Sequence, residues 1–192
     1  MKGNTEIVRC DWANMHPLLT EYHDREWGVP LLDENRVFEM FSLDCFQAGL
    51  SWLTILKKRE AFLQAFDGFL IDQVATFTDQ KIGELLLNQG IIRNRLKIPA
   101  VIHNARLAQE VRKEFDTFAN YIWSFSKGKV MHNAWESQHD IPASSALSDK
   151  MSRDMIKRGF KFAGSTICYA FMQSIGMVND HLVSCFRYEK LV

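Results

Sequence analysis

The stretch His181-Leu182-Val183-Ser184-Cys185 places a histidine and a cysteine four residues apart near the end of the chain. A second such pair, Cys10 and His23, lies near its start. Together the four side chains match the tetrahedral shell that Zn²⁺ prefers in proteins. If all four bind one ion, that ion brings the two ends of the chain together and closes a loop that spans most of the sequence.

A simpler interpretation of these four residues stays open. Free cysteine is among the most buried residue types, whatever its role. The spacing of His181 and Cys185 puts both on one face of a helix, which also suits ordinary packing. A pattern split across a whole domain is weaker than two compact pairs. Spacing alone therefore leaves zinc as a hypothesis. An ion with four protein ligands would be structural, because catalytic zinc keeps one position for water.

The composition is that of an ordinary globular protein. The 192 residues, of which 47% are hydrophobic and 24% charged, suit one domain over residues 1–192. The net charge of zero argues against a surface coated in positive charge, but it permits a local basic strip. No apolar run is long enough to span a membrane, and residues 1–6 carry no apolar signal core. We therefore expect a cytoplasmic protein whose four cysteines are thiols or ligands.

Helical periodicity dominates the chain, and alternating strand patterns are nearly absent. Capping residues precede most of the apolar stripes. The pattern predicts an all-α fold of about eight helices, which include Asp33 to Cys45, Ser51 to Phe66, Thr78 or Asp79 to Leu86 with Gly90 at its end, Val101 to Val111, Thr117 to Trp123, Ser144 or Ser145 to Met155, and Ser165 to Ile175. Pro99 follows Gly90 inside an apolar pattern, so the helix there either begins later or bends.

The junction from Gly90 to Lys97 is a candidate site for DNA backbone phosphates. A glycine-containing turn between two helices presents backbone N–H groups at a helix N-terminus, where phosphates bind. Its three basic side chains, Arg93, Arg95 and Lys97, would add affinity that does not depend on base sequence. A solvated basic surface explains the same pattern equally well. Further basic clusters at 57–59 and 157–161 suggest that one face is positive.

The tryptophan and tyrosine residues in the first third of the chain are Trp12, Tyr22, Trp27 and Trp52. Such residues most often belong to the core. A nucleobase taken out of a duplex, however, needs a stacked and desolvated slot. Asp44 lies in the same region on an otherwise apolar helix, and a buried charge is costly without a partner. It either bonds a backbone group or an arginine, or it contacts a base.

Several stretches then match a known family in collinear order over nearly the full chain. They are Arg9-Cys10-Asp11-Trp12, Tyr22 to Pro30, Gln47 to Trp52, Leu56 to Glu60, Gly90 to Arg93, Arg158 to Cys168 and Val178 to His181. Two of them are highly specific: Tyr-His-Asp-x-Glu-Trp-Gly from Tyr22 and Arg-Gly-Phe-Lys-Phe from Arg158. The chain resembles the 3-methyladenine DNA glycosylase I family.

The resemblance implies a helix-hairpin-helix enzyme that flips out and hydrolytically excises N3-methyladenine from double-stranded alkylated DNA, without strand cleavage. It also implies structural Zn²⁺ that joins the termini and a site at matching positions. We further expect a monomer with no obligatory protein partner. These positions are Cys10, His23, His181 and Cys185 for the metal; Trp12, Tyr22, Trp27, Asp44 and Trp52 for the base; and Gly49, Leu50 and Gly90 for DNA. We expect further DNA contacts from Arg93, Arg95, Lys97 and Lys161.

Asp44 departs from the family, which normally has a glutamate there that hydrogen-bonds the extruded base. The neighbouring Cys45 and Phe46 also differ from the small and amide-bearing residues that usually precede Gln47. Aspartate keeps the charge but is one methylene shorter. It would reach the base through a water, or in a pocket that has moved inward around Phe46.

We interpret Asp44 as the catalytic carboxylate, which orients the departing base and favours it electrostatically, while Tyr22 and Trp52 define the slot. Two other functions remain open. A damage-binding DNA module would bind methylated duplex with weak or no excision. A zinc hydrolase acting on another substrate would need an open position on its metal.

Overall fold

Capping side chains begin several helices where the sequence predicts them. The side chains of Asp33, Ser51, Thr78, Thr117 and Ser145 each accept a hydrogen bond from a backbone N–H three residues later. Each of these bonds satisfies one of the N–H groups that a helix start leaves without a partner. The predicted starts of five helices are therefore confirmed.

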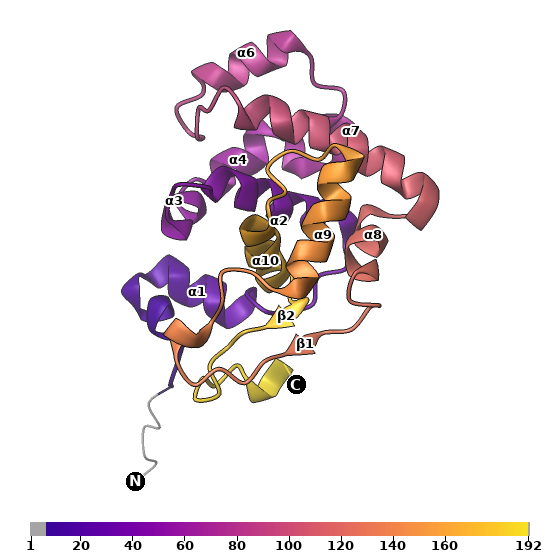
Figure 1. The fold of residues 1–192 in the computed structure, drawn as a ribbon. Coiled ribbons are helices and arrows are strands. Elements are labelled where there is room, and N and C mark those ends of the chain that lie inside the picture. The colour runs from indigo at the N-terminus through magenta and orange to yellow at the C-terminus, as the bar shows by residue number, and fades with distance from the viewer. Residues whose placement is uncertain (1–6, 192) are drawn as a thin grey trace.

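The computed structural model describes residues 7–191, and they form a mostly helical fold (Figure 1). The α-helices are α1 (Pro17–Arg25), α2 (Glu34–Gln47), α3 (Trp52–Leu56), α4 (Arg59–Ala65), α5 (Ile71–Val74), α6 (Asp79–Leu87), α7 (Lys97–Phe115), α8 (Phe118–Ser124), α9 (Ala146–Arg158) and α10 (Ser165–Ser174). Short 3₁₀ turns are η1 (Asp11–Met15), η2 (Asp67–Phe69), η3 (Gln138–Asp140) and η4 (Glu189–Leu191). Two-residue strands β1 (Met131–His132) and β2 (Val178–Asn179) pair in parallel.

Helix α2 runs through the middle of the core. All its residues from Val37 to Phe46 are buried, and α3, α7, α8 and α10 pack around it. A helix that is buried on every side requires a mainly apolar sequence, and this one has it over most of its length. Asp44, near the C-terminal end of α2, is thereby carried into the interior of the protein.

The two ends of the described chain lie together at the end of the molecule opposite α6 (Figure 1). The amide of Phe186 donates to the carbonyl of Val8, and the amide of Leu182 donates to the sulfur of Cys10. The meeting of the ends that the sequence suggested is therefore found. Residues 1–6, whose composition gave no sign of a signal segment, lie outside the described residues.

Two glycines bring the segment after α1 against the end of α10. Gly28 has a φ of 77°, and a Cβ on it would lie 3.1 Å from Nε2 of His181. Gly176 has a φ of 70°, and a Cβ there would lie 2.3 Å from the backbone of Val29. Both positions need glycine, because other residues rarely adopt such φ values and neither site has room for a side chain.

Two details of the predicted helices are wrong. The single helix expected from Ser51 to Phe66 divides into α3 and α4, because the chain turns at Lys57 and Lys58. The ammonium of Lys58 bonds the carbonyls of Gln89 and Gly90 there, a long-range contact that local periodicity does not reveal.

Gly90 does not end the helix before it, because α6 already ends at Leu87. The Gly90 amide instead donates to the Asn88 side chain at 2.8 Å in a local turn. Pro99 is the third residue of α7 and lies in its first turn, where the missing N–H costs nothing. The later helix start is thus the correct alternative. Among residues 7–191, no helix has both the length and the apolar character needed to cross a bilayer.

Candidate active site and metal centre

The four predicted metal ligands meet in the structure. One potential ligand atom from each of Cys10, His23, His181 and Cys185 lies within 4.8 Å of the other three, and all four residues are buried. The ring nitrogens Nε2 of His23 and Nδ1 of His181 are 3.2 Å apart. The Cys185 sulfur lies 3.4 Å and 3.6 Å from these nitrogens, and the Cys10 sulfur lies 3.8 Å from His181 Nδ1.

The four separations given above, out of the six in the cluster, fit a tetrahedral zinc shell. Zn–S bonds of about 2.3 Å and Zn–N bonds of about 2.0–2.1 Å imply edges of about 3.3 Å for N···N and about 3.5 Å for S···N. The observed 3.2 Å and 3.4–3.8 Å agree with those values. The hydrogen bond between the two thiols lowers the pKa of Cys185 and raises the pKa of Cys10, so the protein alone favours a thiolate at Cys185 and a protonated thiol at Cys10.

Both histidine rings are oriented by bonds on their outer sides. His23 Nδ1 donates to Asp24 at 2.8 Å, and His181 Nε2 donates to the carbonyl of Trp27 at 3.1 Å. Each acceptor fixes the tautomer, so the opposite nitrogen presents its lone pair to the cluster. Arg9 forms a two-pronged ion pair with Asp24. Although burial opposes it, bonding from Arg9 and His23 lowers the pKa of Asp24.

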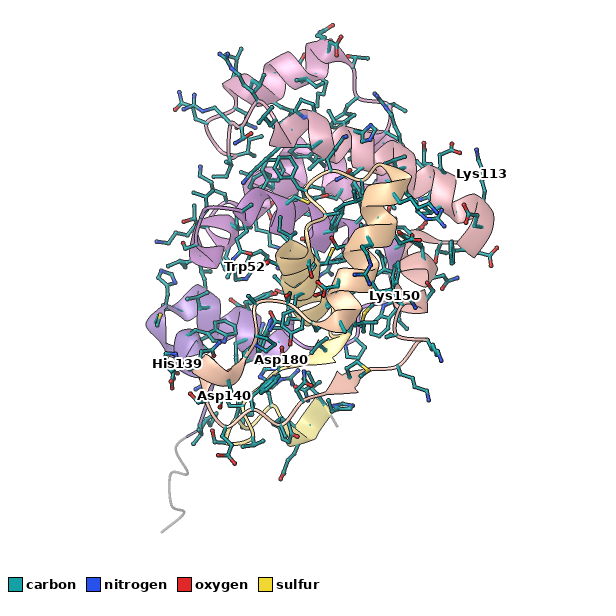
Figure 2. All side chains as sticks on the ribbon, in the orientation of Figure 1. Trp52, Lys113, His139, Asp140, Lys150 and Asp180 are labelled. Atoms are coloured by element: carbon teal, nitrogen blue, oxygen red, sulfur yellow. The ribbon has the colours of Figure 1, made fainter. Side chains whose placement is uncertain are left out.

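The four predicted aromatic residues line one pocket beside this cluster. The cavity has a volume of about 270 Å³, and it is lined by Trp12, Tyr22, Trp27, Asp44, Gln47, Trp52, Gln138, Ala170, Gln173 and Ser174. The rings of Trp12 and Trp27 meet edge to face at 5.1 Å, and those of Tyr22 and Trp52 are 5.2 Å apart. Trp52 lies at the α3 side of the molecule in Figure 2. The result is a slot with aromatic walls, suited to a flat ligand.

The Cys₂His₂ cluster forms part of the support behind this slot. The Trp12 ring meets the His23 ring at 5.3 Å, and the Trp27 ring meets the His181 ring at 4.5 Å, both edge to face. Tyr22 precedes the ligand His23 in α1. Three of the aromatic walls are therefore placed by contact with, or direct sequence connection to, metal-ligand candidates.

Asp44 is part of the pocket lining and is buried, with only 4% of the residue exposed. Its Oδ2 accepts a hydrogen bond from the Ser174 hydroxyl at 3.0 Å. The sequence offered a backbone group or an arginine as its protein partner, and the partner is instead a serine on α10. Burial raises the pKa of Asp44 to about 8, and the bond from Ser174 opposes this only in part. The protein environment by itself thus favours a neutral Asp44 carboxyl at pH 7.

The Trp52 side chain carries an unsatisfied donor. Its Nε1 is buried and, among the described residues, has no hydrogen-bond acceptor. Such a group costs about 1–3 kcal/mol in an ordinary core. Unpaired polar groups of this kind are concentrated at functional sites, where position matters more than stability.

The expected DNA-contacting residues divide into accessible and buried ones. Arg93, Arg95 and Lys161 are exposed, and Leu50, which follows Gly49 at the end of α2, is 41% exposed. The prediction that Lys97 contacts DNA is wrong, because its side chain is buried. Its ammonium donates to the carbonyls of Phe46 and Ala48 at 3.0 Å and 2.6 Å, and it stabilises the C-terminal end of α2.

The arginines of the other two basic clusters are occupied by internal contacts, whereas Lys57, Lys157 and Lys161 are exposed. Arg59 pairs with Glu26 and Glu39. Arg158 pairs with Glu114 and Asp154. These arginines stabilise the fold through ion pairs. They therefore do not support the prediction that all three basic clusters form one positive face. The connection from Asn88 to Leu96 keeps two exposed arginines, Arg93 and Arg95.

Sequence reasoning missed the polar residues that α10 contributes to the pocket. Gln173 and Ser174 line it together with Ala170, one helical turn earlier. A signal was present, because these three residues share one helix face while the rest of α10 is mostly apolar. Gln47 and Gln138 also line the pocket, and Gln138 comes from η3, a segment with no clear periodicity.

Together, the helical fold, the aromatic pocket with its buried acid and the Cys₂His₂ cluster define a helical protein with a pocket shaped for a flat ligand beside a potential metal site. The family model described as "Methyladenine glycosylase" matches residues 12–188. The chain belongs to this family.

Relatives and solved structures agree with this assignment. The chain is 44% identical to DNA-3-methyladenine glycosylase 1 of Escherichia coli (strain K12) over 182 residues, which is 95% of this chain and 97% of that protein. A crystal structure of 3-methyladenine DNA glycosylase I superposes with a TM-score of 0.90 at 46% identity, covering 93% of this chain and 98% of that one. The Staphylococcus aureus enzyme, solved for the structural basis of 3-methyladenine recognition, gives a TM-score of 0.90 at 32% identity, covering 94% and 96%.

The burial of Asp44 predicts a stability difference that depends on pH. Folding raises the pKa of this carboxyl from its ordinary 3.8 to about 8, so the folded protein holds a proton that the unfolded chain releases between these values. Wild-type stability should therefore fall, relative to Asp44→Asn, as pH rises from 5 to 8, by on the order of 3 kcal/mol. Urea unfolding of both proteins at several pH values measures this. Other titrating groups are common to both, so curves that stay parallel would contradict the prediction.

Proposed function

We propose that this chain is a monofunctional DNA glycosylase, a single domain over residues 1–192, that flips out and hydrolytically releases N3-methyladenine from alkylated double-stranded DNA. The main observation in support of this function is a pocket with one buried acid, Asp44, in its lining. Its aromatic walls are Trp12, Tyr22, Trp27 and Trp52. The family membership and the related enzymes, named for action on 3-methyladenine, support the same substrate.

The chemistry requires little from the protein. Alkylation at N3 gives the purine in DNA a positive charge, which makes it a good leaving group. A cation over an aromatic face gains about 0.5–2 kcal/mol, depending on desolvation. Water then completes hydrolysis at the sugar, whose transition state resembles an oxocarbenium ion. The work of the protein is to extrude the nucleotide, stack the base and place a negative charge beside it.

Asp44 is the group that would supply this charge. Its side-chain donor is the neutral Ser174 hydroxyl, and within residues 7–191 no cationic side chain lies at hydrogen-bond distance from it. A cationic base would favour the ionised carboxylate by direct attraction, which reverses the effect of burial on its pKa. The bond to Ser174 also holds the shorter aspartate toward α10. We infer that it contacts the base directly from that side or through one water.

The four-residue cluster would hold structural Zn²⁺. Two sulfurs and two ring nitrogens complete a tetrahedral shell, so the ion would have no position for a reacting water. This donor set gives no support to the alternative of a zinc hydrolase. When bound, the ion would fix the ends of the chain, while Trp12, Tyr22 and Trp27 keep the slot in shape.

The α6–α7 connection would bind the DNA backbone as the hairpin of a helix-hairpin-helix motif. Among the described residues, no protein acceptor is recorded for the amides of Ile92, Arg93 and Arg95. Arg93 and Arg95 are exposed beside these amides. Unpaired amides and flanking arginines are a suitable phosphate site. Gly49 and Leu50, between α2 and α3, would probe the duplex where the base leaves.

Metal content provides one test. Purified protein should contain one zinc ion, and Cys10→Ser should lose it. The variant should also lower Tm by roughly 10 °C, the shift that about 3 kcal/mol produces in a domain of this size. Cys168→Ala is the matched control, because this buried cysteine bonds the Ala163 carbonyl outside the cluster and should retain full zinc. Zinc retained by Cys10→Ser, measured by elemental analysis, would refute the proposed ligand set.

Base release provides the direct test of function. Wild type should liberate 3-methyladenine from methylated duplex DNA, identified by chromatography. Asp44→Asn should reduce the single-turnover rate by about 100-fold, because it removes the charge that favours the departing base. Asp116→Asn, at an exposed residue after α7 whose φ of 68° asparagine tolerates, should behave as wild type. If wild type binds methylated duplex but frees no purine, the chain is a damage-binding module.

DNA affinity tests the hairpin. Arg93→Gln and Arg95→Gln should each weaken binding to undamaged duplex and reduce the slope of log K against log salt by about 1. Lys113→Gln is the control, since Lys113 lies near the far end of α7 (Figure 2) and pairs with Glu110. Fluorescence anisotropy over a range of salt concentrations measures both quantities. Unchanged slopes in both arginine variants would place the DNA elsewhere.

A further inference from the structure

Asp180 is a fully buried carboxylate with four hydrogen-bond donors. It lies directly after β2 and before the metal-ligand candidate His181, between α10 and the paired strands (Figure 2). The donors, all at 2.7 Å, are the Asn133 amide, the Trp135 indole, the Tyr169 hydroxyl and the Gln173 amide. Four donors match the lone-pair capacity of a carboxylate, so the group accepts only.

This arrangement decides how the Gln173 side chain is oriented. An amide can present either its NH₂ group or its oxygen, and the choice is made by its partners. Because Asp180 already accepts three other bonds, the side of Gln173 that faces it must be the donating Nε2. The carbonyl oxygen Oε1 is held on the other side. Rotating the amide would place this oxygen against a carboxylate, which is repulsive.

Gln173 also lines the aromatic pocket, on the same face of α10 as Ser174, the partner of Asp44. Among the described residues, no donor is recorded for Gln173 Oε1. The Gln173 side chain is only partly buried, and its oxygen is accessible to solvent. Gln173 and Asp44 line the same pocket, and the Asp180 contact to Nε2 leaves Oε1 as the atom of this amide that is available to accept a hydrogen bond.

We propose that Gln173 is a specificity-determining residue that selects alkylated purines with a 6-amino group over those with a 6-oxo group, and that Asp180 is its positioning residue. This inference rests on the proposed function and deepens it. The exocyclic amine of an adenine-type base donates hydrogen bonds, which Gln173 Oε1 can accept. The oxygen of a guanine-type base would face another acceptor, and a desolvated site penalises such an unpaired contact.

Binding of the two free bases, 3-methyladenine and 3-methylguanine, tests the proposal without requiring catalysis. Quenching of the pocket tryptophans provides the readout. Gln173→Met keeps the length of the side chain but removes the acceptor. It should weaken binding of 3-methyladenine by roughly tenfold and leave 3-methylguanine unchanged or tighter, because one hydrogen bond is lost for the first base and one repulsion for the second.

Gln73→Met is the matched control, since Gln73 is an exposed glutamine on α5 outside the pocket, and it should change neither affinity. Equal weakening of both bases by Gln173→Met would mean that the residue only supports the pocket, and would overturn the proposal. An unchanged ratio of affinities would overturn it as well.

Asp180→Asn tests the positioning role. Asparagine offers a donor of its own, so the Gln173 amide can turn and present its NH₂ group to the pocket. The preference between the two bases should then narrow by at least tenfold, whereas a purely structural defect would weaken both alike. If this variant does not fold, judged by circular dichroism, Gln173→Met decides the question alone.

Release of both bases from methylated DNA distinguishes a failure of the proposed function from a failure of the inference about Gln173. Wild type that frees neither purine would refute the proposed function, and the inference would fail with it. Wild type that frees 3-methyladenine, together with a Gln173→Met variant of unchanged selectivity, would refute the inference while the proposed function stands.

Discussion

The contact between the two ends of the chain is the constraint on which the pocket depends. Cys10 and His23 come from the first elements, and His181 and Cys185 from the last, yet their ligand atoms lie within 4.8 Å of one another. The aromatic walls follow from this meeting. Tyr22 adjoins His23 in sequence, and the Trp27 carbonyl accepts the bond that orients His181. A change that separates the ends would therefore deform the slot.

A buried hydrogen-bond network connects the Cys₂His₂ cluster to α10, which lines the slot on another side. Asp180 immediately precedes the ligand candidate His181, and it also holds Gln173 on α10. The same helix carries Ser174, which holds Asp44. Two polar groups in the pocket are thus positioned by α10, and α10 is joined to the cluster by one buried carboxylate. A buried carboxylate that accepts four hydrogen bonds, as Asp180 does, rigidifies the side chains that donate to it.

The sequence predicted the local features well and the long-range ones only in part. Helix starts were predictable because a cap and an apolar stripe lie within a few residues of each other, as at Asp33 and Thr117. The break at Lys58 was not, because the partners of this side chain, Gln89 and Gly90, lie far away in the sequence. Lys97 looked like a surface cation, since charge alone does not reveal that two carbonyls at the end of α2 would bury it.

The candidate site, too, could be predicted from the sequence only in part. Aromatic residues and metal ligands have side chains distinctive enough to be identified one by one, whereas an amide such as Gln173 becomes informative only when its partner is known. The resemblance to a family supplied the pairing of the ends that spacing alone left open. It could not supply the partner of Asp44, because the family has a longer acid at that position.

The two buried carboxylates of this region show how one fold assigns different tasks to the same chemical group. Asp180 receives four hydrogen bonds at 2.7 Å, which stabilise its charge and leave it no freedom to interact with a ligand. Asp44 receives one from a side chain, so burial dominates and its pKa rises to about 8. A carboxyl with incomplete solvation gains more from a cationic ligand than one already satisfied. Both acids are buried, so the number of hydrogen-bond donors, more than burial, distinguishes their roles. Asp180 positions side chains of the pocket, whereas Asp44 is available to interact with the base.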